Sequence, residues 1–313
     1  MQLKKIKIGN LVAPNNVFLA PLAGYTNCVF RSMCAELGAG LTFTEMVSAK
    51  GLCYDSRNTK ELLLLDPEYD GIKAVQIFGG DPYYMRTACE SSELAPFDLI
   101  DINMGCPMPK IYKNGEGSAL LGDIPRAQKI VSECKKSGKI ISVKFRTGTD
   151  AQHIVTRDFA VAMRDAGADM ITIHGRTRDK IYSGEVDFYQ IAQAKAAVDI
   201  PVIANGGVFS VADAEKLMSE TGADGIAVAR AALSNPFIFA EITGRKISDK
   251  KAYIRRQLED TFSTFDERFA TVYMRKMLAF YSKGMQGAAY FKLRLFACKS
   301  KGEIESILDE MPF

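Results

Sequence analysis

The segment 101–110, Asp-Ile-Asn-Met-Gly-Cys-Pro-Met-Pro-Lys, brings three chemically active side chains onto one short turn. Asn103 donates and accepts hydrogen bonds, Cys106 carries a thiol that can act as an acid or a nucleophile, and Lys110 is cationic. An apolar pair precedes the segment, and a glycine and prolines interrupt it, so we expect a buried strand that ends here and presents Cys106. The simpler alternative is a buried free cysteine in an ordinary strand-to-loop turn.

Short apolar or β-branched runs recur along roughly the first 240 residues, and a longer helical pattern follows each of them. Repeated eight times, this alternation predicts an α/β fold, a (β/α)8 TIM barrel. A doubly wound sheet is the alternative, but no G-x-G-x-x-G follows the first run. The runs span 17–20, 41–44, 74–78, 99–103, 140–145, 170–174, 201–204 and 225–229.

The strand pattern stops after Pro236, and only helical patterns follow. We therefore expect two domains, a catalytic barrel over 1–243 and a C-terminal all-α helical domain over 244–313. The helical patterns span 250–265, 270–283, 288–298 and 301–309.

Positive charge is concentrated in the helical part of the chain. Residues 245–301 carry 14 Lys and Arg against 5 Asp and Glu, whereas residues 1–244 carry 26 against 28. A basic block on a near-neutral body predicts a polyanionic partner for that block. A solvated helical surface with no partner is the alternative.

Polar and cationic residues stand at the expected ends of at least six strands, and in a TIM barrel these C-terminal strand ends form the active site. The glycine pair at 206–207 and Arg230 follow the last two strands, where barrels commonly bind phosphate. We expect a phosphorylated cofactor there, with its ring near Gln76 and Lys144. The alternatives are a tight turn for the glycines, a solvent-facing Lys144, and a His174 satisfied within the core.

The composition is that of an ordinary globular protein, with 47% apolar and 25% charged residues. No apolar run approaches the ~18 residues of a membrane span, and no apolar core follows the basic N-terminus as in a secretion signal. The seven cysteines show neither C-x-x-C nor metal-ligand spacing, and there are only two histidines. We therefore expect no metal, reduced thiols and a cytoplasmic location without membrane attachment.

Taken together, these motifs resemble those of the flavin-dependent tRNA-dihydrouridine synthase family over nearly the whole chain. DINMGCP and HGRTR are the most specific of them, and a lone glycine turn would not be specific. The matching segments include APLAGYTNCVFR (20–31), VQIFGGDP (75–82), DINMGCPMPK (101–110), GEGSALL (115–121), SVKFRTG (142–148), ITIHGRTR (171–178), PVIANGGV (201–208), GADGIAVARAALSNPFIF (222–239) and RKMLAFYSKGMQGAA (275–289).

The resemblance implies a barrel that carries FMN, a helical domain that binds tRNA, and NADPH as the reductant. It implies that Cys106 is the catalytic acid, and that Asn103, Arg146 and Arg178 contact the uridine substrate. We also expect a monomer. By position, the resemblance places FMN contacts on Pro21, Leu22, Ala23, Gln76, Lys144, His174, Asn205, Gly206, Gly207, Ala229 and Arg230.

Two other functions remain open from the sequence. A flavin barrel acting on a free pyrimidine would explain the barrel and the cysteine, but it leaves the basic helical block without a purpose. A non-catalytic RNA-binding protein on a barrel scaffold would explain that block, but it leaves Cys106, Lys144 and His174 unexplained.

Overall fold

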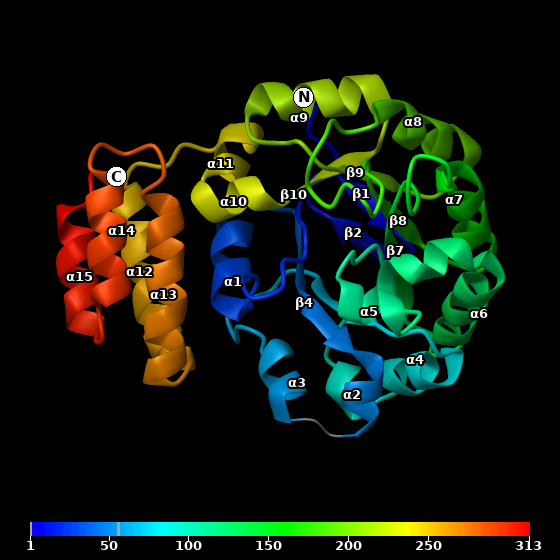
Figure 1. Cartoon of the computed structure of the whole chain (residues 1–313), viewed down its shortest axis with the longest axis horizontal. Coiled ribbons are helices and arrows are strands. Elements are labelled where there is room, and N and C mark those ends of the chain that lie inside the picture. Colours follow the sequence, from blue (N-terminus) through cyan, green and yellow to red (C-terminus); the bar gives the residue numbers. More distant parts are fainter. Residues whose placement is uncertain (1, 55–56) are drawn as a thin grey trace.

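Eight parallel strands close into a barrel in this computed structural model, which describes residues 2–54 and 57–313 (Figure 1). Neighbours in the barrel are also neighbours along the chain, and the last strand pairs with the first. The predicted TIM-barrel class is thus confirmed. The strands are β3 (Val17–Leu19), β4 (Leu41–Ser48), β5 (Lys73–Phe78), β6 (Leu99–Met104), β7 (Ile140–Arg146), β8 (Met170–His174), β9 (Val202–Asn205) and β10 (Gly225–Val228).

A short antiparallel hairpin, β1 (Ile6–Ile8) and β2 (Leu11–Ala13), precedes the barrel. Its apolar side chains belong to the same buried cluster as residues at the starts of the barrel strands, such as Leu41, Leu99 and Met170. The hairpin therefore fills the N-terminal end of the barrel. As a result, the interior is closed on that side and the functional opening is left to the C-terminal strand ends. The sequence interpretation did not include this hairpin.

Helices cover the outside of the barrel, and many begin at a side chain that caps them. Asn27, Asp123 and Ser210 each accept a backbone N–H from the first turn of the helix that follows. The covering helices are α1 (Cys28–Glu36), α2 (Ala49–Cys53), α3 (Arg57–Leu62), α4 (Pro82–Cys89), α5 (Pro109–Lys113), α6 (Ile124–Lys135), α7 (Thr156–Asp165), α8 (Phe188–Ala197) and α9 (Val211–Thr221).

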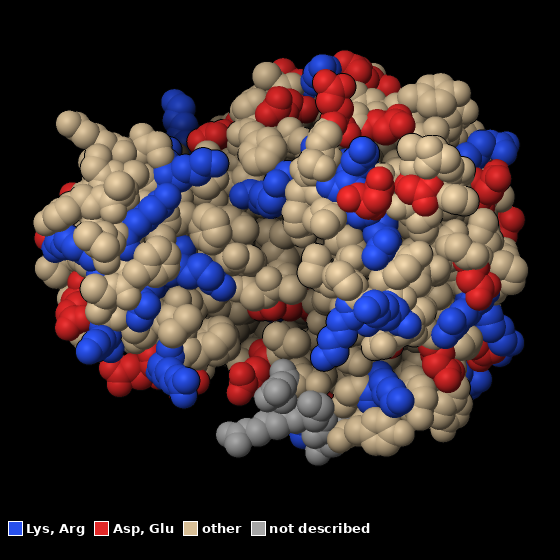
Figure 2. Space-filling model, in the orientation of Figure 1, with Lys and Arg blue, Asp and Glu red and all other residues tan. Residues whose placement is uncertain are grey.

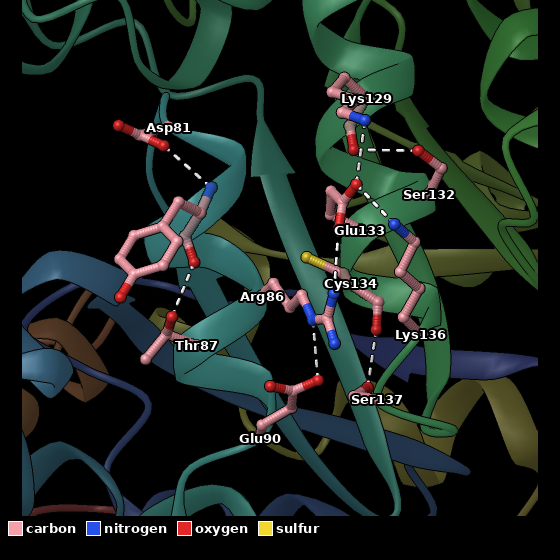
Figure 3. A network of polar contacts seen from close by, with 11 residues as sticks. Asp81, Arg86, Thr87, Glu90, Lys129, Ser132, Glu133, Cys134, Lys136 and Ser137 are labelled. Carbon is pink, nitrogen blue, oxygen red and sulfur yellow. Dashed lines mark hydrogen bonds and ion pairs between the residues drawn. The ribbon is translucent and has the colours of Figure 1, made fainter.

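A charged network ties α4 to α6 on the outer surface (Figure 3). Arg86 pairs with Glu90 on its own helix at 2.9 Å and with Glu133 on α6 at 3.5 Å. Glu133 also pairs with Lys129 at 3.0 Å and Lys136 at 2.7 Å, and these hydrogen bonds lower the pKa of its carboxyl to about 2. Apart from the partly buried Glu133, the charged groups of the network are exposed, so we assign it a modest role in helix packing.

Six further helices follow the last strand: α10 (Arg230–Ser234), α11 (Ile238–Thr243), α12 (Lys250–Thr264), α13 (Glu267–Tyr281), α14 (Ala288–Ala297) and α15 (Lys301–Glu310). In Figure 1, α12 to α15 form a bundle beside the barrel, with α10 and α11 between the two. We call α12–α15 the helical bundle. Its residues Ile254, Leu258 and Met277 belong to the same buried cluster as residues of the barrel strands and of the helices that cover them. The bundle is thus packed firmly onto the barrel.

The described chain passes from α11, which ends at Thr243, to α12, which begins at Lys250. Polar contacts reinforce the packing next to this connection. The guanidinium of Arg245 donates to the carbonyl of Glu36 at 2.7 Å, and Arg256 forms an ion pair with the Glu36 side chain. The two domain ranges remain a prediction. Among the described residues, no helix combines the length and apolar character that crossing a membrane requires.

Candidate active site

A cavity of about 760 Å³ opens at the C-terminal ends of the barrel strands. All eight strands, or the residues that directly follow them, contribute to its wall. Figure 2 shows the surface hollowed between the barrel and the helical bundle, with Lys and Arg side chains around the hollow. The bundle contributes part of the wall through Ala279, Phe280, Lys283 and Lys292.

The cavity brings together residues that are widely spaced in the sequence. Every cofactor residue expected from the sequence lines it, as do Cys106, Asn103 and Arg146. Arg178 is the exception. Its guanidinium lies over the ring of Tyr112 on α5, 3.6 Å from the ring centre, and it does not line the cavity. Arg178 thus links the loop after β8 to the segment after Cys106, and its expected contact with uridine remains a prediction. The cofactor residues in the wall are Pro21, Leu22, Ala23, Gln76, Lys144, His174, Asn205, Gly206, Gly207, Ala229 and Arg230.

The wall of the cavity is strongly cationic. None of the described residues that line it is Asp or Glu, so the positive charges have no carboxylate partner within the wall. An anionic ligand would supply the missing counter-charge. The cationic lining residues are Lys144, Arg146, Arg176, Arg230, Lys283 and Lys292.

Lys144 on β7 is the most constrained of these cations. Burial, with a further contribution from nearby Arg146, lowers the pKa of its ammonium to about 8. Its Nζ has no hydrogen-bond partner among the described residues, although it belongs to the cavity wall. Because an ammonium carries three donors, this group is available to bind an electronegative ligand atom.

One corner of the cavity has the shape of a phosphate site. Gly206 and Gly207 follow β9 with φ values of +121° and +75°, which a residue with a side chain rarely adopts. A Cβ on Gly206 would also lie 3.0 Å from Cδ2 of His174. Arg230, directly after β10, lies over the rings of Tyr182 and Phe209. Exposed backbone beside a fixed guanidinium, after the last two barrel strands, suits a phosphate group.

His174 at the end of β8 lies beside this corner and is buried. Burial, followed by the charges of four cations in the wall, lowers the pKa of its imidazole well below the ordinary value. The ring is therefore neutral at neutral pH, and Nη1 of Arg176 lies 3.4 Å from its Nε2. A neutral His174 can offer a hydrogen bond without adding a charge.

A chain of hydrogen bonds runs from the barrel interior to the turn that carries the cysteine. The buried carboxylate of Asp101 accepts from the Ser142 hydroxyl and from Nε2 of Gln76, both at 2.6 Å. Oε1 of Gln76 accepts from Nδ2 of Asn103 at 2.9 Å, and Oδ1 of Asn103 accepts the backbone N–H of Cys106 at 2.8 Å. The network fixes both amide orientations. Burial raises the pKa of Asp101 to about 6.

Cys106 is 9% exposed, and both its backbone N–H and its carbonyl are held by side chains. Its backbone N–H is bound as above, and its carbonyl accepts from the hydroxyl of Ser118 at 2.8 Å. Burial raises the pKa of the Cys106 thiol, although Arg146 and Lys144 partly oppose this. The thiol therefore stays protonated at neutral pH, which suits a proton donor better than a nucleophile.

Arg146 at the end of β7 braces the same turn. Its Nε donates to the carbonyl of Gly105 at 2.8 Å, and its Nη1 donates to the carbonyls of Thr177 at 3.1 Å and Ile181 at 2.8 Å. Burial lowers the pKa of its guanidinium to about 10, so it remains charged. Arg146 thus joins the cysteine turn to the loop after β8 while it also faces the cavity.

Several residues of the wall were not among those expected from the sequence. Met46 enters because β4 runs to Ser48, past an irregularity between Phe43 and Met46, whereas the sequence pattern predicts an end near residue 44. Tyr182 and Phe209 come from loops and were not singled out as site residues, although Tyr182 begins the segment YSGEVDF (182–188), which is part of the family resemblance. Arg176 lies within the HGRTR segment, which did contain the signal. The residues of α13 and of the segment after it could not be assigned to the cavity without the packing of the bundle.

The fold is shared with solved structures of low sequence identity. An old yellow enzyme homologue from Zymomonas mobilis has a TM-score of 0.53 at 14% identity, covering 74% of this chain and 89% of that one. A 2-naphthoyl-CoA reductase has a TM-score of 0.60 at 10% identity, covering 77% of this chain and 52% of that one. At such low identity, the likeness supports the barrel fold alone.

Sequence comparison gives a more specific result. The model of the family described as dihydrouridine synthase matches residues 18–312. A probable tRNA-dihydrouridine synthase 1 from Synechocystis is 36% identical, covering 98% of this chain and 89% of the relative. A tRNA-dihydrouridine synthase B from Pseudomonas aeruginosa is 34% identical, covering 92% of this chain and 90% of the relative. The resemblance drawn from the motifs is therefore confirmed, and the chain belongs to the dihydrouridine synthase family, a family of enzymes.

Proposed function

We propose that this protein is a tRNA-dihydrouridine synthase that reduces the C5–C6 double bond of uridines in tRNA, with FMN as its cofactor and NADPH as the reductant. The observation that carries the proposal is the placement of the protonated Cys106 thiol in the same cavity as the cation-lined glycine corner. Family membership and the names of the relatives support the reaction.

The cavity fits FMN by the chemistry of its wall. The glycine pair 206–207 and Arg230 would hold the phosphate, and Gln76 and Lys144 would meet the polar edges of the ring. The remaining wall residues Pro21, Leu22, Ala23, His174, Asn205 and Ala229 would enclose the cofactor. When bound, FMN would accept hydride from NADPH and deliver it to C6 of the uracil ring.

Cys106 completes the reduction from the protein side. Its Sγ–H bond breaks, the proton forms the new C–H bond at C5, and solvent returns a proton to the thiolate. Negative charge develops on the uracil carbonyl as the ring is reduced, and the fixed guanidinium of Arg146 would stabilise it. The Oδ1 atom of Asn103 already accepts the backbone N–H of Cys106, and its Nδ2 already donates to Gln76. We therefore assign Asn103 mainly to the positioning of Cys106 at the substrate.

The uridine must leave its stacked position to reach this cavity, because the reacting atoms lie inside the cavity at the C-terminal ends of the barrel strands. Loop nucleotides of a folded RNA are the cheapest to extrude. Lys283 and Lys292 stand at the side of the cavity formed by the helical bundle, and Figure 2 shows further Lys and Arg on that face. These cations would bind the phosphates that flank the extruded nucleotide.

The proposed substrate is tested by NADPH consumption. With FMN-loaded protein, we expect NADPH oxidation to be stimulated by tRNA that lacks dihydrouridine and not by free uracil or dihydroorotate. Fully modified tRNA of the same sequence is the matched control, since it offers the same phosphates without a reducible base. Stimulation by the free pyrimidines alone would instead favour a small-molecule flavin enzyme.

RNA binding should depend steeply on salt concentration. We expect K283Q and K292Q each to weaken tRNA binding and to reduce the slope of log Kd against log salt concentration by about 1, because each removes one phosphate contact. K7Q, in the exposed hairpin at the opposite end of the barrel, is the control and should leave the slope unchanged. If the wild type, K283Q, K292Q and K7Q gave the same slope, Lys283 and Lys292 would not contact the RNA.

A further inference from the structure

The backbone of Gly24 is held at its N–H and at its carbonyl by two different parts of the molecule. Gly24 lies in the turn between β3 and α1, with a φ of +80°. Its N–H donates to the carboxylate of Glu45 on β4, a barrel strand. Its carbonyl accepts from Nζ of Lys276 on α13, a helix of the bundle, at 2.6 Å. The barrel and the bundle thus meet at one residue, Gly24, through the two peptide groups that flank its Cα.

The next residue of the turn is held by the same helix. The hydroxyl of Tyr273 donates to the carbonyl of Tyr25 at 2.6 Å, and Nζ of Lys276 lies 4.1 Å from the centre of the Tyr25 ring. The ring of Phe280 meets the Tyr25 ring edge-on at 5.7 Å. Positions 273, 276 and 280 are three and four residues apart and so lie on one face of α13. This face of α13 therefore contacts the turn that carries Gly24 and Tyr25.

The two ionisable groups of this contact are poorly solvated, so their geometry carries more weight than that of a surface ion pair. The Glu45 side chain is buried, and burial raises the pKa of its carboxyl. Lys276 is partly buried, and burial lowers the pKa of its ammonium. The carboxylate of Glu45 and the ammonium of Lys276 attract each other across Gly24. Removing either one leaves the other without its partner in a region of low solvation.

The residues on both sides of Gly24 line the cavity, with Tyr25 after it and three residues before it. Pro21, Leu22 and Ala23 form its wall at the end of β3. Within the turn, the Leu22 N–H donates to the hydroxyl of Thr26 at 3.1 Å. That bond closes the turn on itself but does not fix its position relative to the strands. The contacts of Glu45, Lys276 and Tyr273 supply that fixation.

From this arrangement we propose that Lys276 is a positioning residue for the cofactor: together with Tyr273 and Glu45, it fixes the wall segment 21–23 against the flavin. The helical bundle is then a structural part of the flavin site as well as a surface for RNA. This inference rests on the proposed function, because it takes the cavity to be the FMN site.

The test is titration of flavin-free, full-length protein with FMN, followed by the quenching of FMN fluorescence. We expect K276M to weaken FMN binding by about 10-fold, since it removes one charge-assisted hydrogen bond from the turn. K276R should restore most of the affinity, because arginine can also donate to the Gly24 carbonyl. R268M removes a charge from an exposed position of the same helix and should bind FMN as the wild type does. Y273F, which loses one hydroxyl, is a milder second variant and should show a smaller loss.

A purely structural role for Lys276 gives a different pattern. It would lower the melting temperature of K276M in proportion to any loss of affinity, and it would leave the flavin absorption spectrum of the bound form unchanged. We expect a shifted flavin spectrum in K276M, because the wall against the flavin moves, and recovery of the wild-type spectrum in K276R.

The possible results separate this inference from the proposed function. If wild-type protein binds FMN and K276M and Y273F bind it equally well, the inference is wrong and the proposed function stands. If wild-type protein binds no FMN at all, both are wrong. Loss of affinity in R268M equal to that in K276M would also contradict the inference, because it would show a general effect of charge.

Discussion

Replacing Cys106 by alanine is expected to lower the rate of uridine reduction by about 10²–10⁴-fold, the range that a general acid typically contributes. The substitution removes the proton donor and leaves its surroundings in place, because Asn103 and Ser118 bind the backbone of residue 106. FMN and tRNA should therefore still bind to C106A with nearly unchanged affinity. Single-turnover reduction of tRNA by enzyme with pre-reduced flavin measures this effect directly.

The matched control is C53A, which removes another thiol near the same end of the barrel. Cys53 lies on α2 and is not part of the cavity wall. The C53A variant should reduce uridine as fast as the wild type. Equal rates in C106A and the wild type, with tRNA bound in both, would show that the proton comes from another source.

The raised pKa of Cys106 also sets a direction for the pH dependence. A proton donor works while it is protonated, so its contribution is present below its pKa and is lost as the pH rises through that value. Burial raises this pKa above that of an ordinary thiol. The limb that Cys106 adds to the pH profile should therefore lie above the ordinary range for thiols and should be absent in C106A.

The second large effect is expected from K144M. Lys144 offers a cation without a hydrogen-bond partner to the cavity, and removing such a preorganised group from the site of developing charge typically costs about 10²–10³-fold in kcat. K7M is the control, because it removes a charge from the exposed hairpin at the far end of the barrel. Turnover by K144M at the wild-type rate would exclude Lys144 from the reaction.

Lys144 should also make FMN binding depend on pH. With its pKa lowered to about 8, the ammonium is charged below that value and neutral above it. FMN affinity of the flavin-free protein should thus fall as the pH rises from 7 to 9, and K144M should lose this dependence. In the loaded enzyme the anionic ligand favours the charged form, so the same transition should lie at higher pH.

The barrel and most of its site were predictable from the sequence because local patterns encode them. Apolar runs of strand length, alternating with helical patterns, give the order of the elements, and the barrel then places the strand ends together. That is why Gln76 and Lys144, far apart in sequence, were expected in one cavity. The hairpin β1–β2 escaped notice because its strands have only three residues each and Lys7 interrupts the apolar pattern of the first.

Other features depend on tertiary packing and carry no local signal. Arg178 stands within a highly specific motif, yet its side chain lies over Tyr112, an arrangement that only the position of α5 decides. Lys276 and Phe280 read in the sequence as parts of an ordinary amphipathic helix. Their contacts with the turn at Tyr25 arise from the docking of the bundle on the barrel. Sequence motifs therefore indicated the candidate chemistry, and the structure adds the contacts by which the bundle holds the turn beside the cavity wall.

The most direct test of the account is mass spectrometry of tRNA that lacks dihydrouridine, after incubation with FMN-loaded protein and NADPH. We expect a uridine at a defined position to gain two hydrogens, with C106A showing far less conversion in the same time. Mapping the fragment that carries the added mass would identify the substrate position. Oxidation of NADPH with bound FMN but without added hydrogens in any tRNA of a complete pool would contradict the proposed reaction.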